Sequence, residues 1–336
     1  MTNKERVIRT INHIETDYVP YSIDFTLQER ERVAKYLNDD KFINRINNHI
    51  FSVYYDGWPK EMTPGTGYFK DDFGVVWNRN GTDKDIGVIN GYVLPEPDLR
   101  DYKFPEPDAA ELRRRLQKLV SDHPDDFKIF DLGFSLFERA WTMRGMENLL
   151  ADMIEEPDFV DELLDAIADY NLKIVDIALE YDIDGLKFGD DWGQQSGLIM
   201  GPGYWRRFIK PRIARMYKKG RENGKYILQH SCGDIHEIFP DVIEIGLDVY
   251  QTFQPEIYDI KAVKSGFGGR LTFWGGISTQ RLLPCAAPDE VERVTRETIG
   301  IMKPGGGYIA APTHSVPGDV PPENIMAMLK AFENQV

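Results

Sequence analysis

The sequence predicts an α/β fold, specifically a (β/α)8 barrel, built as a single domain over residues 1–336. Three observations favour this fold. Short runs of β-rich sequence alternate with longer helical patterns along most of the chain. About eight strand candidates fit into roughly 300 residues, which is an ordinary size for one such barrel. No glycine-rich phosphate-binding turn follows the first candidate, and this disfavours a doubly wound sheet.

The strand candidates are short runs rich in β-branched, aromatic and other apolar residues. The first follows an N-terminal amphipathic helix, and the third follows a charged helix predicted over residues 109–121. In chain order, the eight predicted strands are Val19–Asp24, Ile50–Tyr55, Phe127–Leu132, Gly185–Gly189, Tyr226–Gln229, Asp248–Thr252, Arg270–Trp274 and Gly307–Ala311.

Apolar residues at helical spacing predict helices among the later strands. Asp234 is a candidate N-cap for one of them, and Pro288 suits the first turn of another. These predicted helices cover residues 158–181, 203–223, 235–245, 288–303 and 322–334.

The stretch between the second and third predicted strands is too long for a simple loop. It contains the turn signals Asn80-Gly81 and Asn90-Gly91, which are typical of β-hairpins. We therefore expect a small β-rich insertion at residues 60–105, within the barrel domain. Its last part is rich in proline and charge, as expected for a connecting strap.

Composition excludes several classes of protein. With 42% hydrophobic and 28% charged residues, the chain is globular rather than disordered. The net charge is −15 and no run of Lys and Arg forms a basic face, so nucleic acid is not an expected partner. No apolar run approaches the ~18 residues of a membrane span. Two cysteines exclude a disulfide framework, so we expect the protein in the reducing cytoplasm. We also expect its substrate to be a small molecule. The sequence leaves open whether the protein forms a homodimer.

Polar residues that can carry chemistry follow four of the predicted strands. These groups are Asp190-Asp191, His230-Ser231-Cys232, Gln254-Pro255-Glu256 and Thr313-His314. In a (β/α)8 barrel the carboxyl ends of the strands meet at one rim, where the active site lies. The sequence therefore predicts an active site at this rim.

His230 and Cys232 form an H-x-C pair. Residues two apart in extended chain point to the same side, so the imidazole and the thiolate could share one metal ion. Zinc accepts mixed nitrogen and sulfur ligands and keeps a thiol deprotonated. His314 is the natural third ligand, because the last strand closes the barrel. The alternatives are a buried structural cysteine with a surface histidine, and a loop histidine that contacts substrate. Cys285 is expected to be a packed small residue rather than a ligand.

Three carboxylates are candidate catalytic groups. Asp190 and Asp191 are adjacent, so in extended chain they face opposite sides, and one of them is expected to point into the rim. Each is a candidate general acid or base, or a metal ligand, and the alternative is helix capping. Glu256 is a candidate for a fourth, oxygen ligand or for hydrogen bonding to substrate.

A further set of polar and aromatic residues is predicted to bind substrate. Glu138 and Arg139 follow the third strand, where a structural ion pair is the competing interpretation. The predicted substrate-binding residues are Glu138, Arg139, Trp192, Gln194, Gln254 and Tyr55.

Several longer motifs resemble the uroporphyrinogen decarboxylase superfamily. They include FGDDWGQQSGLIMGPGYWRRFIKPR, HSCGDI and PTHSVPGDVPPENI, and the N-terminal ERVIRTINHIETDYVPYSIDF is similar to the opening of that family. The resemblance spans nearly the whole chain, with the motifs in the same order, and it too implies a (β/α)8 barrel.

The resemblance is greater to one branch of that superfamily. True decarboxylases carry a Gly-rich, Arg-bearing segment after the first strand, which binds substrate carboxylates, whereas this chain has SIDFTLQERER there. The branch of methylcobalamin-dependent methyltransferases binds zinc through H-x-C and a later Cys. His230 and Cys232 match the H-x-C, and His314 aligns with the later Cys.

This resemblance implies a zinc-dependent methyltransferase that exchanges a methyl group with methylcobalamin carried by a corrinoid protein. Zinc would be held by His230, Cys232 and His314. One alternative is a metal-free decarboxylase of the uroporphyrinogen type, in which Arg139, Arg206 or Lys187 would hold the substrate acid. A second alternative is a non-catalytic partner of a corrinoid protein.

Overall fold

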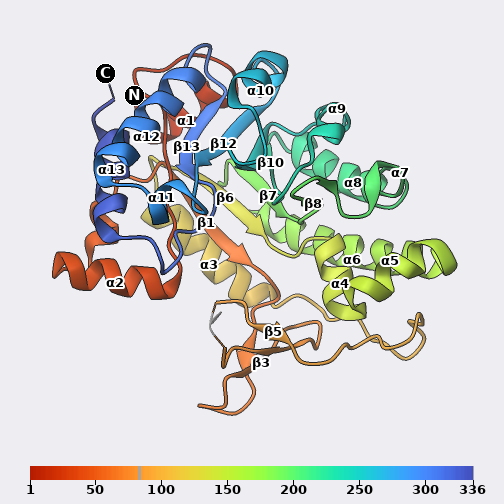
Figure 1. The fold of residues 1–336 in the computed structure, drawn as a ribbon. Coiled ribbons are helices and arrows are strands. Elements are labelled where there is room, and N and C mark those ends of the chain that lie inside the picture. Colours follow the sequence, from red (N-terminus) through yellow and green to blue (C-terminus); the bar gives the residue numbers. More distant parts are fainter. Residues whose placement is uncertain (82–84, 336) are drawn as a thin grey trace.

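The computed structural model describes residues 1–81 and 85–335. Within these residues, seven parallel strands form one curled sheet in the order β1-β6-β7-β10-β11-β12-β13 (Figure 1). Each strand pairs with the next of these strands along the chain, which is the connectivity of repeated β-α-β units. Their bounds are β1 Ile50–Tyr55, β6 Phe127–Leu132, β7 Gly185–Gly189, β10 Tyr226–His230, β11 Val249–Phe253, β12 Thr272–Ile277 and β13 Tyr308–Pro312.

Seven of the eight predicted strands are thus confirmed, with ends that differ by a few residues. The remaining candidate, Val19–Asp24, is fully described but makes only single bridges, such as Tyr21 to Ala310. Pro20 has no N–H to donate, and the N–H of Ile23 donates to the side chain of Asn48 instead of to a backbone carbonyl. The segment still contacts both edges of the sheet: Ala310 N–H donates to Pro20 O (2.9 Å), and His49 N–H donates to Tyr21 O (3.1 Å).

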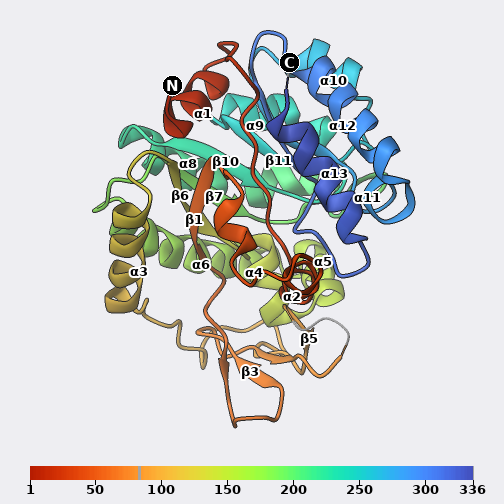
Figure 2. The ribbon, with the colours of Figure 1, turned by 90° about the vertical axis from the view of Figure 1, so that its left-hand side faces the viewer.

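Helices pack around the outside of the curled sheet (Figure 1, Figure 2). The predicted helices are confirmed, and α12 begins with Pro288 in its first turn. The helical segments are α1 Asn3–Ile11, α2 Leu27–Leu37, η1 Phe42–Arg45, α3 Ala109–Asp122, α4 Phe137–Arg144, α5 Met146–Glu155, α6 Pro157–Ala178, α7 Gly201–Tyr204, η2 Trp205–Ile209, α8 Lys210–Glu222, η3 His236–Ile238, α9 Phe239–Glu244, α10 Ile260–Phe267, α11 Leu282–Cys285, α12 Pro288–Met302 and α13 Pro322–Glu333.

The interior of the curl holds its own apolar cluster. Val7 and Ile11 of α1 pack there against residues from six of the strands, among them Ile50, Leu228 and Ile309. Because so many strands contribute to one cluster, the cluster lies inside the curl. Helix α1 covers the end of the curl at which the strands begin, where Lys4 N–H donates to Asp125 O and Gly307 N–H donates to Thr10 O. Towards the end of β1, successive side chains alternate in burial: Val53 is buried, while Tyr54 is 49% exposed.

A separate antiparallel sheet lies between β1 and β6 in sequence. Its order is β2-β3-β4-β5, and it projects from one end of the molecule (Figure 2). The expected β-rich character of this region is present over residues 60–89, and the described residues from 90 to 105 form no strand. The turn signal Asn80-Gly81 is followed directly by residues 82–84, which lie outside the described residues. The four strands are β2 Lys60–Glu61, β3 Tyr68–Lys70, β4 Val76–Asn78 and β5 Val88–Ile89.

In the described part of the chain, the search for a helix long and apolar enough to cross a bilayer finds none.

Candidate metal centre

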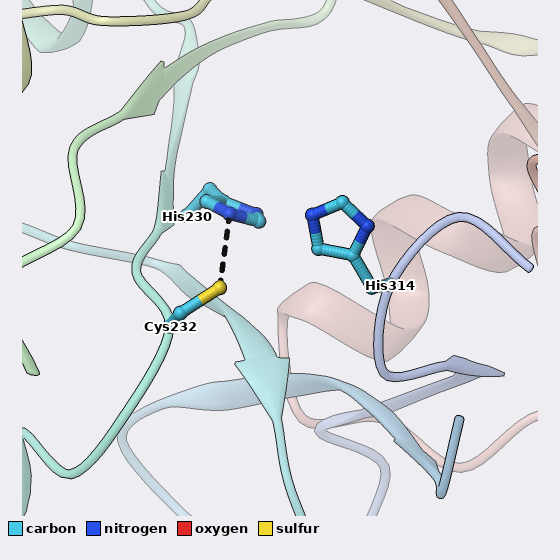
Figure 3. Close-up of side chains that lie close together, drawn as sticks. All are labelled: His230, Cys232 and His314. Atoms are coloured by element: carbon cyan, nitrogen blue, oxygen red, sulfur yellow. Dashed lines mark hydrogen bonds between the residues drawn. The ribbon is translucent and has the colours of Figure 1, made fainter. Parts of the chain in front are cut away.

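The curled sheet brings His230, Cys232 and His314 together. His230 ends β10, Cys232 follows two residues later, and His314 lies two residues beyond β13. One potential ligand atom from each lies within 4.8 Å of the other two, and Cys232 Sγ is 3.7 Å from His230 Nε2. Figure 3 shows the thiol and the two imidazoles facing one another across a small space. The predicted convergence of these three side chains is therefore present in the structure.

The loop after β10 turns sharply at Gly233, where the backbone conformation requires glycine. Its φ of +78° favours glycine, and a β-carbon there would overlap the backbone of Gly193. Gln254 Oε1 accepts the N–H of Gly233 at 2.8 Å, so this predicted substrate-binding residue holds the loop that follows Cys232.

Gln251 fixes the orientation of the His230 ring. Its Oε1 lies 2.8 Å from Nδ1 of His230, so Nδ1–H is the donor and Nε2 is left with a lone pair on the side of Cys232. Metal-binding histidines are usually held in this way by an acceptor on the other ring nitrogen. Sequence reasoning missed Gln251, because its place opposite His230 in the neighbouring parallel strand depends on the strand register, which only the structure gives.

The two adjacent aspartates face opposite sides, as predicted. Asp191 Oδ1 accepts the N–H of Cys232 at 2.7 Å and lies 3.5 Å from Nε2 of His230. Asp190 is completely buried and turns towards α4. Its carboxylate accepts the N–H groups of Leu136, Phe137 and Glu138, together with the indole N–H of Trp192 at 2.6 Å. Burial raises the pKa of Asp190 to about 6. Asp191 therefore borders the cluster, whereas the contacts of Asp190 are those of a helix cap.

The surroundings of Cys232 favour a cation. Burial raises the pKa of its thiol, and the neighbouring carboxylate of Asp191 raises it further. Without a positive charge nearby, the sulfur stays protonated at neutral pH. A bound Zn²⁺ deprotonates a cysteine ligand, and one sulfur with two imidazole nitrogens is a donor set that zinc prefers. Three protein ligands also leave a fourth position open for a reacting molecule. The residues present therefore fit a catalytic zinc ion.

Comparison with known proteins identifies the family. The family model described as uroporphyrinogen decarboxylase (URO-D) matches residues 98–335, which include all three candidate ligands. The chain belongs to the URO-D family. Among curated proteins, none matches the sequence significantly.

A solved structure shares the fold of this URO-D family member. A methyltransferase from Methanosarcina mazei superimposes with a TM-score of 0.75 at 18% identity, covering 99% of this chain and 98% of the other. At that identity the likeness shows the fold alone. A protein described as a vitamin-B12-independent methionine synthase from Listeria monocytogenes gives a TM-score of only 0.47 at 11% identity, covering 95% of this chain and 96% of the other.

The residues predicted after the third strand separate in the structure. Glu138 lies beside Asp191, and burial together with the charges of Asp191 and Asp190 raises its pKa well above the usual range. Arg139 turns away and is buried against the small sheet, where Nη1 donates to Asp71 at 2.7 Å and Nη2 donates to the carbonyl of Asp56 at 2.7 Å. The ion pair of Arg139 is therefore with Asp71 rather than with Glu138.

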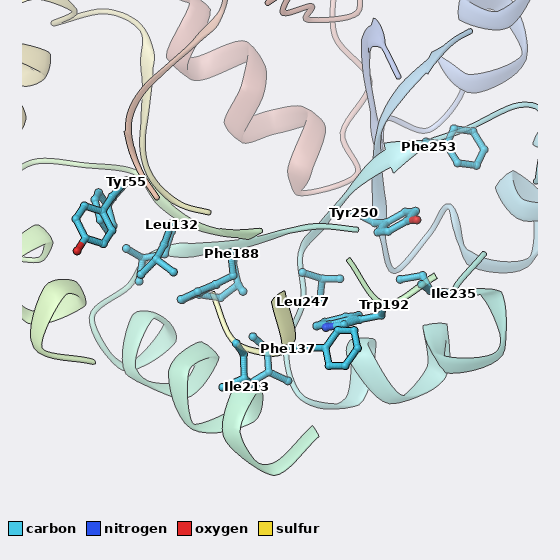
Figure 4. Packing of buried hydrophobic residues seen from close by; sticks show 14 of the residues in the cluster. Tyr55, Leu132, Phe137, Phe188, Trp192, Ile213, Ile235, Leu247, Tyr250 and Phe253 are labelled. Atoms are coloured by element: carbon cyan, nitrogen blue, oxygen red, sulfur yellow. The ribbon is translucent and has the colours of Figure 1, made fainter. Parts of the chain in front are cut away.

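Two predicted aromatic contacts belong to the packing between sheet and helices (Figure 4). The hydroxyl of Tyr55 bonds to Tyr170 and to Asp72, and Trp192 is completely buried against Trp205. The exposed neighbour Tyr54 points to the interior instead, with its hydroxyl occupying the space where a β-carbon of residue 133 would lie. Gln194 is exposed, and its backbone carbonyl accepts the N–H of Asp234.

Glu256 and Cys285 lie outside the cluster of ligands. Oε1 of Glu256 accepts a hydrogen bond from Ser278, and Cys285 is exposed on α11. The other cations that sequence analysis considered are paired with carboxylates: Lys187 with Asp131 at 2.8 Å, and Arg206 with Asp241 at 2.9 Å.

Proposed function

We propose that this chain is a zinc-dependent methyltransferase that exchanges a methyl group with methylcobalamin carried by a corrinoid protein. The observation that carries the proposal is the convergence of His230, Cys232 and His314 to within 4.8 Å. Membership of the URO-D family and the fold shared with a methyltransferase support it. A small-molecule methyl donor or acceptor and a corrinoid-protein partner are parts of the proposal, and we expect the enzyme to act in the cytoplasm.

The proposal takes the fold to be a single-domain (β/α)8 barrel in which residues 19–24 occupy the eighth strand position. The backbone carbonyls of Pro20 and Tyr21 accept hydrogen bonds from Ala310 and His49 at the two edges of the sheet, and these bonds support this view. Residues 60–105 would then be an insertion on the barrel.

Zinc supplies Lewis acidity, which holds an acceptor thiol as its thiolate or polarises the heteroatom that bears the methyl group. The residues of the chain do the rest. Gln251 holds His230 in the tautomer that presents Nε2. Asp191, a partly exposed carboxylate at the edge of the cluster, takes the proton that the acceptor loses.

Metal-free decarboxylation of a porphyrinogen is the alternative that family membership also supports. Such a substrate carries several carboxylates, which need cations when they are buried. Arg139, Arg206 and Lys187 each pair with a carboxylate of the protein. This pairing favours the methyltransferase.

The deciding experiment is elemental analysis of the full-length protein after zinc loading and gel filtration. We expect equimolar zinc in the wild type and in the control Cys285→Ser, and loss of zinc in Cys232→Ser and His230→Ala. Methyl transfer from methylcobalamin to a thiol should depend on that zinc and stop with a chelator. A wild-type protein that retains no zinc, or that decarboxylates a porphyrinogen in the presence of a chelator, would overturn the proposal.

A further inference from the structure

His314 differs from the other two candidate ligands in how it is held. Gln251 fixes the ring of His230, and the N–H of Cys232 donates to Asp191. The side chain of His314 is exposed, and in the part of the chain that the structure describes its imidazole makes no hydrogen bond. It lies edge-on to His230, with ring centroids 5.7 Å apart. Its place beside the other ligands therefore depends on the backbone that carries it.

The residue before His314 is tied to β12. The N–H of Thr313 donates to Ile277 O at 2.8 Å, which continues the pairing of β13 with β12. The hydroxyl of Thr313 lies 2.8 Å from that of Thr279, and it also accepts the N–H of Thr279 at 3.2 Å. These contacts fix the chain on one side of His314.

The residues after His314 are tied to an N-terminal segment, Ser22–Thr26. The N–H of Val316 donates to the carbonyl of Asp24 at 2.8 Å, and the N–H of Thr26 donates to the carbonyl of Val316 at 3.1 Å. This pairing lies on the opposite edge of the chain from β12. The backbone around His314 is therefore held from two sides, and the second side is supplied by a segment almost 300 residues earlier.

Asp24 adds a side-chain contact to this pairing. Its Oδ2 accepts the hydroxyl of Ser315, the residue next to His314, at 3.1 Å. A hydroxyl that donates to a carboxylate makes a charge-assisted hydrogen bond. Asp24 thus holds the loop twice, through its carbonyl at Val316 and through its carboxylate at Ser315. Both partners lie within two residues of His314.

We propose that the segment Ser22–Thr26 positions His314 for zinc, with Asp24 as the positioning residue. The inference rests on the proposed zinc centre. A ligand on an untethered loop must be ordered when the metal binds, which costs conformational free energy, whereas the docked segment orders this loop beforehand. Because the coupling between two binding equilibria is reciprocal, zinc in turn strengthens the docking of the segment.

The first test measures the zinc affinity of the full-length protein by competition with a chromophoric chelator. Asp24→Ala and Ser315→Ala remove the same hydrogen bond, so each should weaken zinc binding by about 3- to 10-fold, and the double variant should lose no more. Asp24→Asn keeps an acceptor for Ser315 and should retain most of the affinity, which separates positioning from the loss of a negative charge. Asp319→Ala, at an exposed carboxylate of the same loop, should bind zinc like the wild type.

A double-mutant cycle shows whether Asp24 acts through His314. In the His314→Ala background, Asp24→Ala should change the zinc affinity by less than about twofold, because the ligand that Asp24 positions is gone. A general loss of stability would instead weaken zinc binding in both backgrounds. With cobalt(II) in place of zinc, the visible spectrum of Asp24→Ala should shift towards that of His314→Ala, whereas Asp24→Asn should resemble the wild type.

Hydrogen–deuterium exchange tests the reciprocal effect. Zinc should slow the exchange of the peptides that contain Ser22–Thr26 and Val316 several-fold in the wild type, and much less in His314→Ala.

Three results would overturn the proposal although the wild type binds zinc. Asp24→Ala and Ser315→Ala could bind zinc as tightly as the wild type, Asp24→Ala could weaken binding as much without His314 as with it, or zinc could leave the exchange of Ser22–Thr26 unchanged. A wild-type protein that binds no zinc would overturn the proposed function together with this inference.

Discussion

The side-chain oxygen of Gln251 lies 2.8 Å from Nδ1 of His230, across the neighbouring strands β11 and β10. This contact determines which nitrogen of the imidazole is free. Because Nδ1 is occupied, Nε2 is the nitrogen that can bind a metal ion beside Cys232. The acceptor thus comes from a strand that supplies no ligand of its own.

We expect Gln251→Leu to weaken zinc binding by about 10- to 100-fold, because the ring loses the acceptor that orients it. Competition with a chromophoric chelator measures the affinity. Gln195→Leu, at an exposed glutamine of the neighbouring loop, is the matched control and should bind zinc normally. An unchanged affinity in Gln251→Leu would show that this hydrogen bond plays no part in holding the metal.

His314 is expected to be the third zinc ligand. His314→Ala should lower the zinc affinity by at least about tenfold, since one of three protein ligands is lost. His314→Cys should bind zinc more tightly than the alanine variant, because a thiolate is also a preferred ligand. The same chelator competition compares them. If His314→Ala binds zinc as the wild type does, then His314 contacts substrate instead.

Arg139 should be a structural residue. Its ion pair with Asp71 is buried on both sides, and Asp71 also accepts from Val75 and Trp77. Arg139→Met leaves this carboxylate without its counter-charge and should lower the free energy of unfolding by about 3–5 kcal/mol. Urea denaturation measures the loss.

Two further variants check that interpretation. Adding Asp71→Asn to Arg139→Met should restore part of the stability, because the uncompensated charge is removed. Arg113→Met, which breaks an exposed pair with Glu180, should change stability by less than about 1 kcal/mol. An equally small effect of Arg139→Met would contradict the prediction.

Glu29 on α2 should make stability depend on pH. Both of its carboxylate oxygens are buried without a hydrogen bond among the described residues, and burial raises its pKa from 4.5 to about 7. Since the pKa in the folded state is the higher one, stability falls as the pH rises from about 4.5 to about 7. Glu29→Gln removes this loss, so above pH 7 the variant should be more stable by about 3 kcal/mol.

Below pH 4.5 the advantage of Glu29→Gln should vanish, because the carboxyl group is protonated in both states. Thermal unfolding over a pH series measures the difference. Glu31→Gln, at an exposed position on the same helix, should show no such trend. A stability difference that stays constant with pH would refute the assignment to Glu29.

Asp190 should contribute to stability through its cap on α4. Asp190→Ala leaves three backbone N–H groups and the indole of Trp192 without their acceptor. We expect a loss of about 3 kcal/mol or more in the free energy of unfolding, measured in urea. Asp191→Ala is the matched comparison: it should unfold almost normally but transfer methyl groups more slowly. The reverse pattern would indicate that Asp190, rather than Asp191, is the catalytic carboxylate.

Much of the fold was predictable because its signals are local. The runs that became β6, β12 and β13 are buried along their whole length, and their β-rich composition already marks them. The H-x-C pair was equally readable, because side chains two apart in extended chain share a side. The segment Val19–Asp24 did not form a regular strand, because its hydrogen bonds go partly to the side chain of Asn48.

The sequence by itself determined the order of strands and helices and the rim at which His230 and Cys232 lie, since both depend on spacing within a few residues. Only the tertiary structure decided that His314 meets them, that Asp191 rather than Asp190 faces the cluster, and that Arg139 pairs with Asp71. Those outcomes depend on how far the sheet curls and on which partner each buried charge reaches. Residues far apart in the chain settle both, through packing and the cost of burying an unpaired charge.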